Sequence, residues 1–386
     1  MKRTIAAVLV VAAAFVTAGA SASGTATVHA LVWEKNTLSL ATLDATTLAP
    51  RARPLALGRA QGEVFTDSLG ERLAVASAGA GIVIVDTRRM GVLWRLPRGR
   101  LVRAVSWLSP TRLLVVEHGG VLLLDPLRKR IVARSDFDGV VLASAKWSNG
   151  LVLLAFRNEG SIEPARLFVV GPGVGVRTTE LSRIAAGWAS ASTSEGDVNS
   201  AQPALAVDAV GGRAFVAGGP HLATIDLASL SVSYVGSERT LQKWASGPRR
   251  SAAWLGDGVL AVAGADEKWT GAGTTSTPFG LRYVSSSGVR VIDENATLVN
   301  AAGGLALAYG NRYTNGGTEG IGLIAYDRAG AFRWRLFDDT PISSLTVAGN
   351  RAYVWAGRRL QVVDLVAGAV IGGTDVPRTR WLQIIG

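Results

Sequence analysis

The chain has 386 residues, of which 48% are hydrophobic, and it contains no cysteine. The absence of cysteine excludes disulfide bonds, a thiol nucleophile and thiolate metal sites, so a large apolar core must supply the stability. The net charge is +11, and the segment from Arg51 to Arg134 holds 15 Lys and Arg residues against 6 Asp and Glu residues. The basic character is therefore concentrated in about one quarter to one third of the chain.

The N-terminus has the pattern of an export signal. A basic start precedes the apolar run Ile5–Val16, and Ala20-Ser21-Ala22 fits a signal-peptidase site. We predict a signal peptide over 1–22 and a single domain over 23–386. The apolar run is shorter than a comfortable membrane span of about 20 residues, although an uncleaved anchor is the alternative. We therefore expect an extracellular or cell-envelope protein with no transmembrane span after signal cleavage.

The stretch Asp67–Gly99 contains the unit that the rest of the chain repeats. Short β-branched and aliphatic runs, Arg72–Ser77, Gly81–Asp86 and Gly91–Pro97, alternate with turns rich in Gly, Asp and Ser, which predicts antiparallel strands. With a preceding strand at Glu63–Asp67, they form a four-stranded sheet of about 40 residues, the size of one propeller blade.

The strand Gly81–Asp86 is one of eight similar strands along the chain. The eight are Thr37–Asp44, Gly81–Asp86, Val121–Asp125, Arg166–Gly171, Leu222–Asp226, Gly280–Ser286, Gly322–Asp327 and Leu360–Asp364. Their spacing is typical of propeller repeats. We predict an all-β fold, an eight-bladed β-propeller, with seven blades as the alternative.

Six of these strands end in aspartate, at Asp44, Asp86, Asp125, Asp226, Asp327 and Asp364. An aspartate at a strand end can accept backbone N–H bonds from the next residues and fix the turn that follows. In the other two strands the position is Gly171 or Ser286, which a shared metal or catalytic role would not tolerate. We therefore interpret the aspartates as turn-forming residues.

The two ends of the chain complement each other. The N-terminal blade begins at His29–Glu34 and lacks an innermost strand, whereas Trp381–Ile385 remains after the eighth blade has ended. Pairing of these two segments would close the ring and remove two exposed strand edges. We predict this closure.

Two repeat patterns resemble known families. The segment Arg72–Pro97 resembles the repeats of the YVTN family. Ala325-Tyr326-Asp327, followed by Gly330 and Trp334, is similar to the tryptophan-docking repeat of the quinoprotein (PQQ-like) propellers, and Gly91 with Trp94 repeats part of it. The resemblance implies a superfamily of exported bacterial-type proteins that includes quinone-dependent dehydrogenases, lactonase-like hydrolases and non-enzymatic scaffolds. Quinoprotein alcohol dehydrogenases commonly carry adjacent cysteines beside the cofactor, and this chain has no cysteine.

Insertions point to one face of the ring. In a propeller, the turns between second and third strands share a face with the connections between blades. The long turns are Arg157–Pro164, Gly264–Phe279 and Gly310–Glu319, and the long connections are Ser182–Gln202 and Ser237–Arg250. All five belong to this looped face in blades four to seven, where binding residues are expected on loops.

The candidate ligand-binding residues on this face carry mixed charge and aromatic rings, which suit a protein or glycan partner. They are Asp266, Glu267, Lys268, Trp269, Asn311, Arg312, Tyr313, Asn315, Trp188 and Trp244, together with His118 and His221 in turns. The alternative is that they belong to solvated, variable insertions. No histidine spacing of a metal site and no calcium loop is present, so we predict no metal site.

The basic segment provides a second candidate surface. Arg88, Arg89, Arg128, Lys129 and Arg130 occupy turns before outer strands, with Arg95, Arg98 and Arg134 on or beyond those strands. The favoured interpretation is that these charges protect the outer strands against edge-to-edge aggregation. The alternative is that they bind an anionic surface, such as lipid head groups or a cell-surface polymer. Nucleic acid is not expected, because aromatic residues do not interleave with the arginines.

Two functions follow from these patterns. The first is an exported, monomeric, non-catalytic binding or scaffold module that acts through the loops of one face. The alternative is a lactonase-like hydrolase or a quinone-dependent dehydrogenase with its site in the central funnel. We predict no cofactor, and pyrroloquinoline quinone or Ca²⁺ would be needed only by the alternative.

Overall fold

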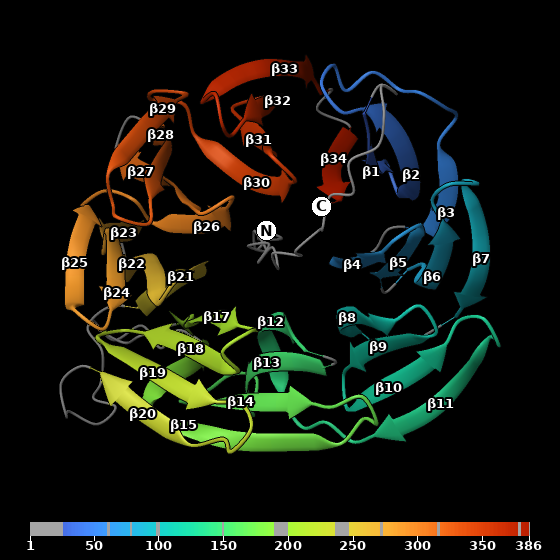
Figure 1. Ribbon diagram of the computed structural model, residues 1–386, viewed down its shortest axis with the longest axis horizontal. Helices are drawn as coiled ribbons and strands as arrows, with labels where there is room; N and C mark the ends of the chain where they lie inside the picture. Colours follow the sequence, from blue (N-terminus) through green and yellow to red (C-terminus); the bar gives the residue numbers. More distant parts are fainter. Residues whose placement is uncertain are drawn as a thin grey trace.

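The computed structural model describes residues 26–59, 62–77, 79–97, 101–148, 150–188, 200–235, 247–270, 273–314, 317–376 and 380–385. Within these ranges the regular elements are β-strands, which form eight small sheets arranged as a ring (Figure 1). The predicted eight-bladed β-propeller is confirmed, and the seven-bladed alternative is wrong. The predicted signal peptide, residues 1–22, lies outside the described residues.

Each blade is an antiparallel sheet whose strands follow one another from the axis outward (Figure 1). Blade 1 contains β34 (Arg380–Ile385), β1 (Thr27–Glu34), β2 (Thr37–Asp44) and β3 (Leu55–Arg59). Blade 2 contains β4 (Val64–Leu69), β5 (Arg72–Ser77), β6 (Gly81–Asp86) and β7 (Gly91–Leu96). Blade 3 contains β8 (Val102–Ser109), β9 (Arg112–Glu117), β10 (Gly120–Asp125) and β11 (Arg130–Ser135).

Blades 4 and 6 each have an additional short strand. Blade 4 contains β12 (Val140–Trp147), β13 (Gly150–Phe156), β14 (Ile162–Val170), β15 (Val176–Trp188) and β16 (Ser200–Ala201). Blade 5 contains β17 (Ala204–Asp208), β18 (Arg213–Gly218), β19 (His221–Asp226) and β20 (Val232–Val235). Blade 6 contains β21 (Gly247–Gly256), β22 (Val259–Thr270), β23 (Gly273–Pro278), β24 (Leu281–Ser285) and β25 (Gly288–Asp293).

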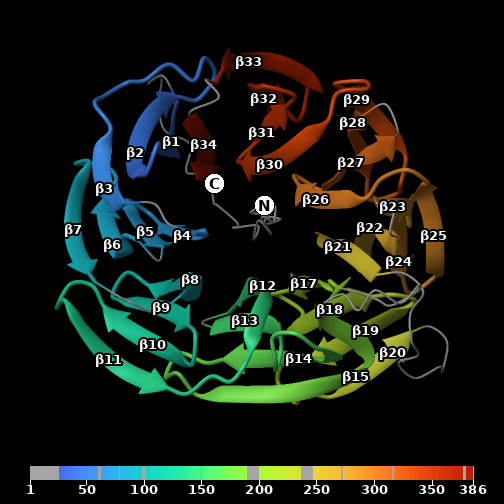
Figure 2. The ribbon, with the colours of Figure 1, turned by 180° about the vertical axis from the view of Figure 1, so that it is seen from behind.

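The last two blades are four-stranded. Blade 7 contains β26 (Leu298–Ala302), β27 (Leu305–Thr314), β28 (Gly317–Asp327) and β29 (Phe332–Leu336). Blade 8 contains β30 (Ile342–Ala348), β31 (Arg351–Ala356), β32 (Arg359–Asp364) and β33 (Ala369–Asp375). Because successive strands are antiparallel, the turns alternate between the two faces of the ring, which Figures 1 and 2 show from opposite sides. We call the face with the first-to-second and third-to-fourth turns the turn face; the other is the looped face.

The C-terminal strand closes the ring as the sequence predicts. β34 lies on the inner side of β1 and pairs with it antiparallel, with Ile385 opposite His29 and Arg380 opposite Glu34. Leu382 and Ile384 are buried in the core between blades 1 and 8. The indole N–H of Trp355 in blade 8 donates to the carbonyl oxygen of Leu382 at 2.9 Å. The closing strand is therefore held by both adjoining blades.

The six aspartates at strand ends form turns as predicted. In each case a carboxylate oxygen accepts one or two backbone N–H groups from two to four residues further on. These aspartates are Asp44, Asp86, Asp125, Asp226, Asp327 and Asp364. In blade 6 the strand ends one residue before the predicted Ser286. There the hydroxyl of Ser285 accepts the N–H of Ser287 at 3.3 Å, so serine performs the same role.

The tryptophan-docking pattern also has its expected structural role. Trp334 on β29 lies against Gly368 in the outer turn of blade 8, and its indole N–H donates to the carbonyl oxygen of Leu365 at 3.3 Å. A Cβ atom at Gly368 would lie 2.4 Å from the Trp334 ring. Glycine is therefore required for the ring to join blade 7 to blade 8.

Two of the predicted long loops are β-hairpins, so these predictions of loop structure were wrong. In Gly264–Phe279, β22 continues to Thr270 and pairs with β23, with Asp266 opposite Thr277. In Gly310–Glu319, β27 and β28 pair as far as Thr314 and Gly317. Threonine favours strands, and the hairpin satisfies backbone groups that a loop would leave to water. The insertions thus extend the blades beyond the looped face.

The connection Ser182–Gln202 is also partly regular. β15 runs to Trp188, and the short strand β16 pairs with it at Gly187 and Trp188. The backbone N–H of Gln202, which follows β16, donates to the carbonyl oxygen of Pro248 at 2.8 Å. Pro248 lies on β21, the inner strand of blade 6. This segment therefore links blade 4 to blade 6 across the start of blade 5.

Ring closure predicts a large effect for a small change in β34. Replacement Leu382→Ala should lower the free energy of unfolding by about 3 kcal/mol, because it removes a buried side chain between two blades. Gln383→Ala is the matched control, since its side chain is only half-buried and should change stability by less than about 1 kcal/mol. Urea denaturation measures both, and equal effects would contradict a packed closing strand.

The turn aspartates predict a loss of stability in acid. Backbone N–H donors of Thr47, Arg128 and Ser229 are the main cause of the lowered pKa of Asp44, Asp125 and Asp226, respectively. A folded-state pKa below the unfolded value adds stability above the unfolded pKa, and that stability is lost as the pH falls through the lowered value.

We therefore expect the urea midpoint to fall between about pH 5 and pH 2. A variant with Asp44→Asn, Asp125→Asn and Asp226→Asn keeps an oxygen acceptor in each turn but has no titrating charge there, so its midpoint should vary less over this range. An unchanged pH dependence in this variant would show that other groups cause the acid effect.

Candidate functional site

The predicted ligand residues Asp266 and Glu267 lie on β22 beside arginines of β21. Arg250 Nη1 is 2.8 Å from Asp266 Oδ1, and Arg249 Nη1 is 3.6 Å from Glu267 Oε1. The pairs form because the extended β22 runs antiparallel to β21 at this level, with Pro248 opposite Asp266. Both carboxylates are therefore engaged within their own blade.

Arg250 is the centre of a contact that the sequence did not reveal. Its side chain is only 3% exposed, and it donates to the carbonyl oxygens of Ala265 at 2.9 Å and Gly219 at 3.2 Å. The guanidinium carbon lies 4.1 Å from the centre of the Phe279 ring, and that of Arg282 lies 3.9 Å from the same centre. Burial lowers the pKa of Arg250, while Asp266 raises it. The cluster joins blade 6 to the turn of blade 5.

Other predicted ligand residues also make contacts within the ring. The side-chain N–H of Asn311 donates to the carbonyl oxygen of Ile342 at 3.3 Å, and the side-chain oxygen of Asn311 accepts the backbone N–H of Ile342 at 3.2 Å. These two bonds link blade 7 to blade 8. Trp188 is 38% exposed and packs edge to face on Phe156, with ring centres 4.7 Å apart. These contacts hold the blades together, and a role in binding stays a prediction.

The two turn histidines differ in exposure. His118 lies in the exposed turn between β9 and β10, whereas His221 is the first residue of β19 and is buried. The backbones of the remaining predicted residues belong to hairpin strands or lie outside the described residues. Lys268 and Trp269 are on β22, Arg312 and Tyr313 are on β27, and Asn315 and Trp244 are outside the described residues.

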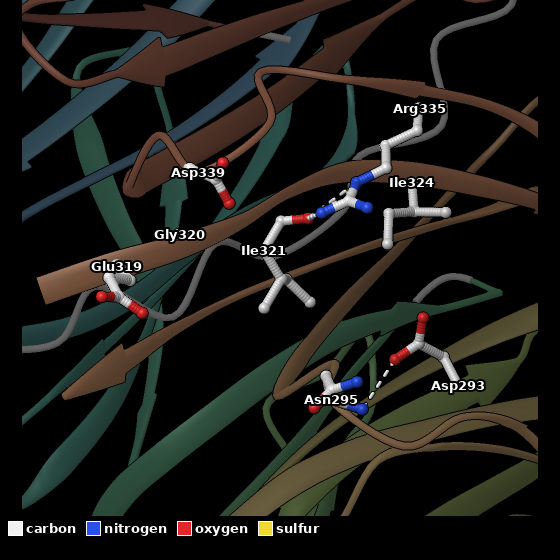
Figure 3. Close-up of a pocket in the computed structure, with 8 residues that line it drawn as sticks. All are labelled: Asp293, Asn295, Glu319, Gly320, Ile321, Ile324, Arg335 and Asp339. Atoms are coloured by element: carbon white, nitrogen blue, oxygen red, sulfur yellow. Dashed lines mark hydrogen bonds between the residues drawn. The ribbon is translucent and has the colours of Figure 1, made fainter. Parts of the chain in front are cut away.

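A pocket of about 210 Å³ opens between blades 6 and 7 on the looped face (Figure 3). Its lining comes from the end of β25, the connection after it, β28, β29 and the connection to blade 8. The lining residues are Asp293, Asn295, Glu319, Gly320, Ile321, Ile324, Arg335 and Asp339. Two aliphatic side chains thus lie among three carboxylates, an amide and a guanidinium.

Two of the polar groups in the pocket are held in place by neighbours. Asp293 accepts the hydroxyl of Tyr326 at 2.7 Å and the N–H of Asn295 at 2.7 Å. Burial is the main cause of the raised pKa of Tyr326, and Asp293 raises it further, so this hydroxyl stays protonated. Arg335 donates to the carbonyl oxygen of Ile321 at 2.9 Å and pairs with Asp338 at 2.7 Å.

The other two carboxylates are available. Glu319 and Asp339 are exposed, and neither forms an ion pair with any other residue that the structure describes. Both line one pocket because Gly320 allows β28 to lie against the connection after β29: a Cβ at Gly320 would be 1.9 Å from the carbonyl oxygen of Thr340. The pocket can therefore offer two carboxylates to a cationic or hydroxyl-bearing ligand.

Asp293 and Asp339 are not among the ligand-binding residues that the sequence predicts. The ring brings them to one pocket from the edges of two blades, together with Glu319 (Figure 3). The nearest available signal was the predicted insertion Gly310–Glu319, whose last residue is Glu319 on β28. No periodic pattern relates these positions to one another.

The basic residues lie on the turn face of blades 2 and 3. Arg88 and Arg89 are in the turn between β6 and β7, and Arg128 and Lys129 are in the turn between β10 and β11, followed by Arg130. We call these five residues the basic corner. Figure 1 shows the outer strands β7 and β11 side by side at the rim of the ring.

The other three predicted basic residues differ from the basic corner. Arg95 donates to the carbonyl oxygen of Leu57, which joins blade 2 to blade 1. Arg134 Nη2 lies 3.9 Å from the buried carboxylate of Glu117 in its own blade. Arg98 lies outside the described residues. Arg95 and Arg134 thus make contacts within the ring, whereas Arg89, Lys129 and Arg130 of the basic corner form no ion pair with another described residue.

Among the described residues, no group of three or more His, Cys, Asp or Glu side chains could hold a metal ion, and we derive no step through one. In the same part of the chain, no helix is long and apolar enough to cross a membrane.

The comparisons with known proteins define the fold. No protein-family model and no curated protein matches the sequence. The dihydro-heme d1 dehydrogenase NirN, in complex with DHE, has a TM-score of 0.59 at 13% identity, over 92% of this chain and 74% of that one. Apo AztD from Citrobacter koseri has a TM-score of 0.56 at 12% identity, over 93% and 98%.

A computationally designed protein, Ika8, has a TM-score of 0.50 at 12% identity, over 90% of this chain and 96% of that one. At these identities the likeness shows the propeller fold alone. The chain is thus of the β-propeller class, and its partner must be inferred from its own surface.

The Arg250 cluster predicts unequal roles for two adjacent arginines. Arg250→Ala should lower the free energy of unfolding by about 2–4 kcal/mol, because it removes buried charge-assisted hydrogen bonds and the contact with Phe279. Arg249→Ala is the control and should cost less than about 1 kcal/mol, since its ion pair is longer and more exposed. Thermal and urea denaturation measure both. Equal losses would contradict a structural role particular to Arg250.

Proposed function

We propose that the protein is an exported, non-catalytic binding module that holds a partner protein at the looped face of blades 6 and 7. The observation that carries this proposal is the pocket in which Glu319 and Asp339 have no ionic partner among the described residues. A rigid ring that presents such a pocket between extended hairpins has the usual arrangement of a binding site on a scaffold.

The chemistry of the pocket favours a lysine or arginine side chain of the partner. Ile321 and Ile324 provide aliphatic surface for its methylene groups, and Glu319 and Asp339 provide acceptors for its charged end. Arg335 is already paired with Asp338, so its charge opposes a cation less than a free guanidinium would. Carboxylates also accept sugar hydroxyls, but none of the eight described lining residues is aromatic, which supports a peptide over a glycan.

The enzymatic alternative stays a prediction of the sequence alone. The likeness to a dehydrogenase is a likeness of fold at 13% identity. The export signal is likewise a prediction, since residues 1–22 lie outside the described ranges. The proposal therefore rests on the pocket, and its test addresses the pocket directly.

Calorimetric titration of the protein with a tri-lysine peptide at low salt tests this function. We expect saturable binding, and Glu319→Gln with Asp339→Asn should weaken it about tenfold or more, because two carboxylates near one ammonium are lost. Asp257→Asn is the matched control: it removes one exposed carboxylate on the turn face and should leave the affinity unchanged.

Two results would contradict the proposal. One is equal binding of tri-lysine to the wild type and to the Glu319 and Asp339 variant. The other is that the wild type binds a neutral chitin oligosaccharide but not tri-lysine, and that the same variant binds the oligosaccharide more weakly. That result would assign the pocket to a glycan.

A further inference from the structure

We propose that the basic corner of blades 2 and 3 docks the propeller onto an anionic lipid bilayer. The site is on the turn face, so it goes beyond the proposed function and leaves the pocket of blades 6 and 7 accessible. Its two turns project from neighbouring blades at the outer rim of the ring (Figures 1 and 2). Three observations support the assignment: available charge, exposed aliphatic side chains and a backbone that fixes the turns.

The cations of the basic corner are incompletely neutralised. Arg88 is 76% exposed and lies 3.5 Å from Glu71, while Arg128 is 70% exposed and lies 3.9 Å from Asp125. Arg89, Lys129 and Arg130 form no ion pair with another described residue. The corner therefore retains most of its positive charge for an external anion.

The nearby aspartates are occupied by the turns themselves. Asp86 accepts the N–H of Arg89 at 2.8 Å, and Asp125 accepts the N–H of Arg128 at 3.1 Å. Asp125 also pairs with Arg112 at 3.3 Å. Because these carboxylates hold the backbone, they fix the two turns that carry the basic side chains.

Aliphatic side chains lie exposed among these cations. Leu127 in the turn of blade 3 is 55% exposed, and Ile131 and Val132, at the start of β11, are 43% and 38% exposed. Val92, at the start of β7 in blade 2, is 39% exposed. Leu127, Ile131 and Val132 lie within two residues of a member of the basic corner, and Val92 lies three residues after Arg89. Water contacts these side chains in the isolated ring.

This combination distinguishes a bilayer from a soluble polyanion. A polyanion would be bound by charge alone, with an affinity that falls steeply with salt. A bilayer interface accepts aliphatic groups below its phosphates, so both the cations and Leu127 would contribute. Arg53 on the turn face of blade 1 is also exposed, and it extends the positive surface in the plane of the ring. The observed surface fits the bilayer better.

Sedimentation of the full mature chain with lipid vesicles tests the proposal. We expect binding to vesicles of phosphatidylcholine with 30% phosphatidylglycerol, and little to phosphatidylcholine alone. Arg128→Gln, Lys129→Gln and Arg130→Gln together should weaken partitioning about a hundredfold, at roughly fivefold for each charge. Leu127→Ser with Val132→Thr, which changes no charge, should weaken it about tenfold.

Matched controls separate docking from damage to the fold. Val366→Ser alters an aliphatic residue, 84% exposed, in the corresponding turn of blade 8 and should leave partitioning unchanged. Glu319→Gln with Asp339→Asn should also leave it unchanged, so failure of docking and failure of the pocket are distinguishable. Thermal midpoints equal to that of the wild type confirm that each variant is folded.

Two outcomes would overturn the proposal. The first is the absence of binding to anionic vesicles at low salt. The second is a pair of results: the Leu127 and Val132 variant binds vesicles as well as the wild type does, and the wild type binds dextran sulfate as tightly as it binds the vesicles. That pair would assign the basic corner to an anionic polymer.

Discussion

Pairing between β34 and β1 is the interaction on which the rest of the structure depends. Every blade buries both of its faces against neighbours, and this is possible for blades 1 and 8 only when the ring is closed. An open array would expose an apolar blade face at each end and the backbone edge of β1. The closing strand is only six residues long, yet it completes the core between the first and last blades.

Closure also sets the positions of the two candidate surfaces. The alternation of strand direction places the pocket of Glu319 and Asp339 on one face and the basic corner on the other. The charges on the two faces are opposite in sign at these sites, although the whole chain is basic. A propeller attached by the turn face would present the pocket away from the surface that holds it. The two proposals are therefore compatible but independently testable.

The fold could be predicted because a blade is a local structure. Consecutive strands pair, so the eight repeats, the turn aspartates and the leftover strand at Trp381 were all readable from short segments. The pocket could not be predicted in this way, because Asp293, Glu319 and Asp339 come together only through packing between blades. The hairpin beyond Gly264 was interpreted as a loop because its Gly, Thr and Ser residues also occur in turns. The buried position of Arg250 depends on Gly219 of another blade, and no sequence pattern links them.

The position of β34 has a consequence for how the protein forms. Blade 1 contains β1, β2 and β3, but its inner strand, β34, follows all the other blades in the chain. Blade 1 is therefore incomplete until residues 380–385 are available, while blades 2 to 7 can form in order. A chain cut before β34 would lack the inner strand of blade 1 and would expose the backbone edge of β1.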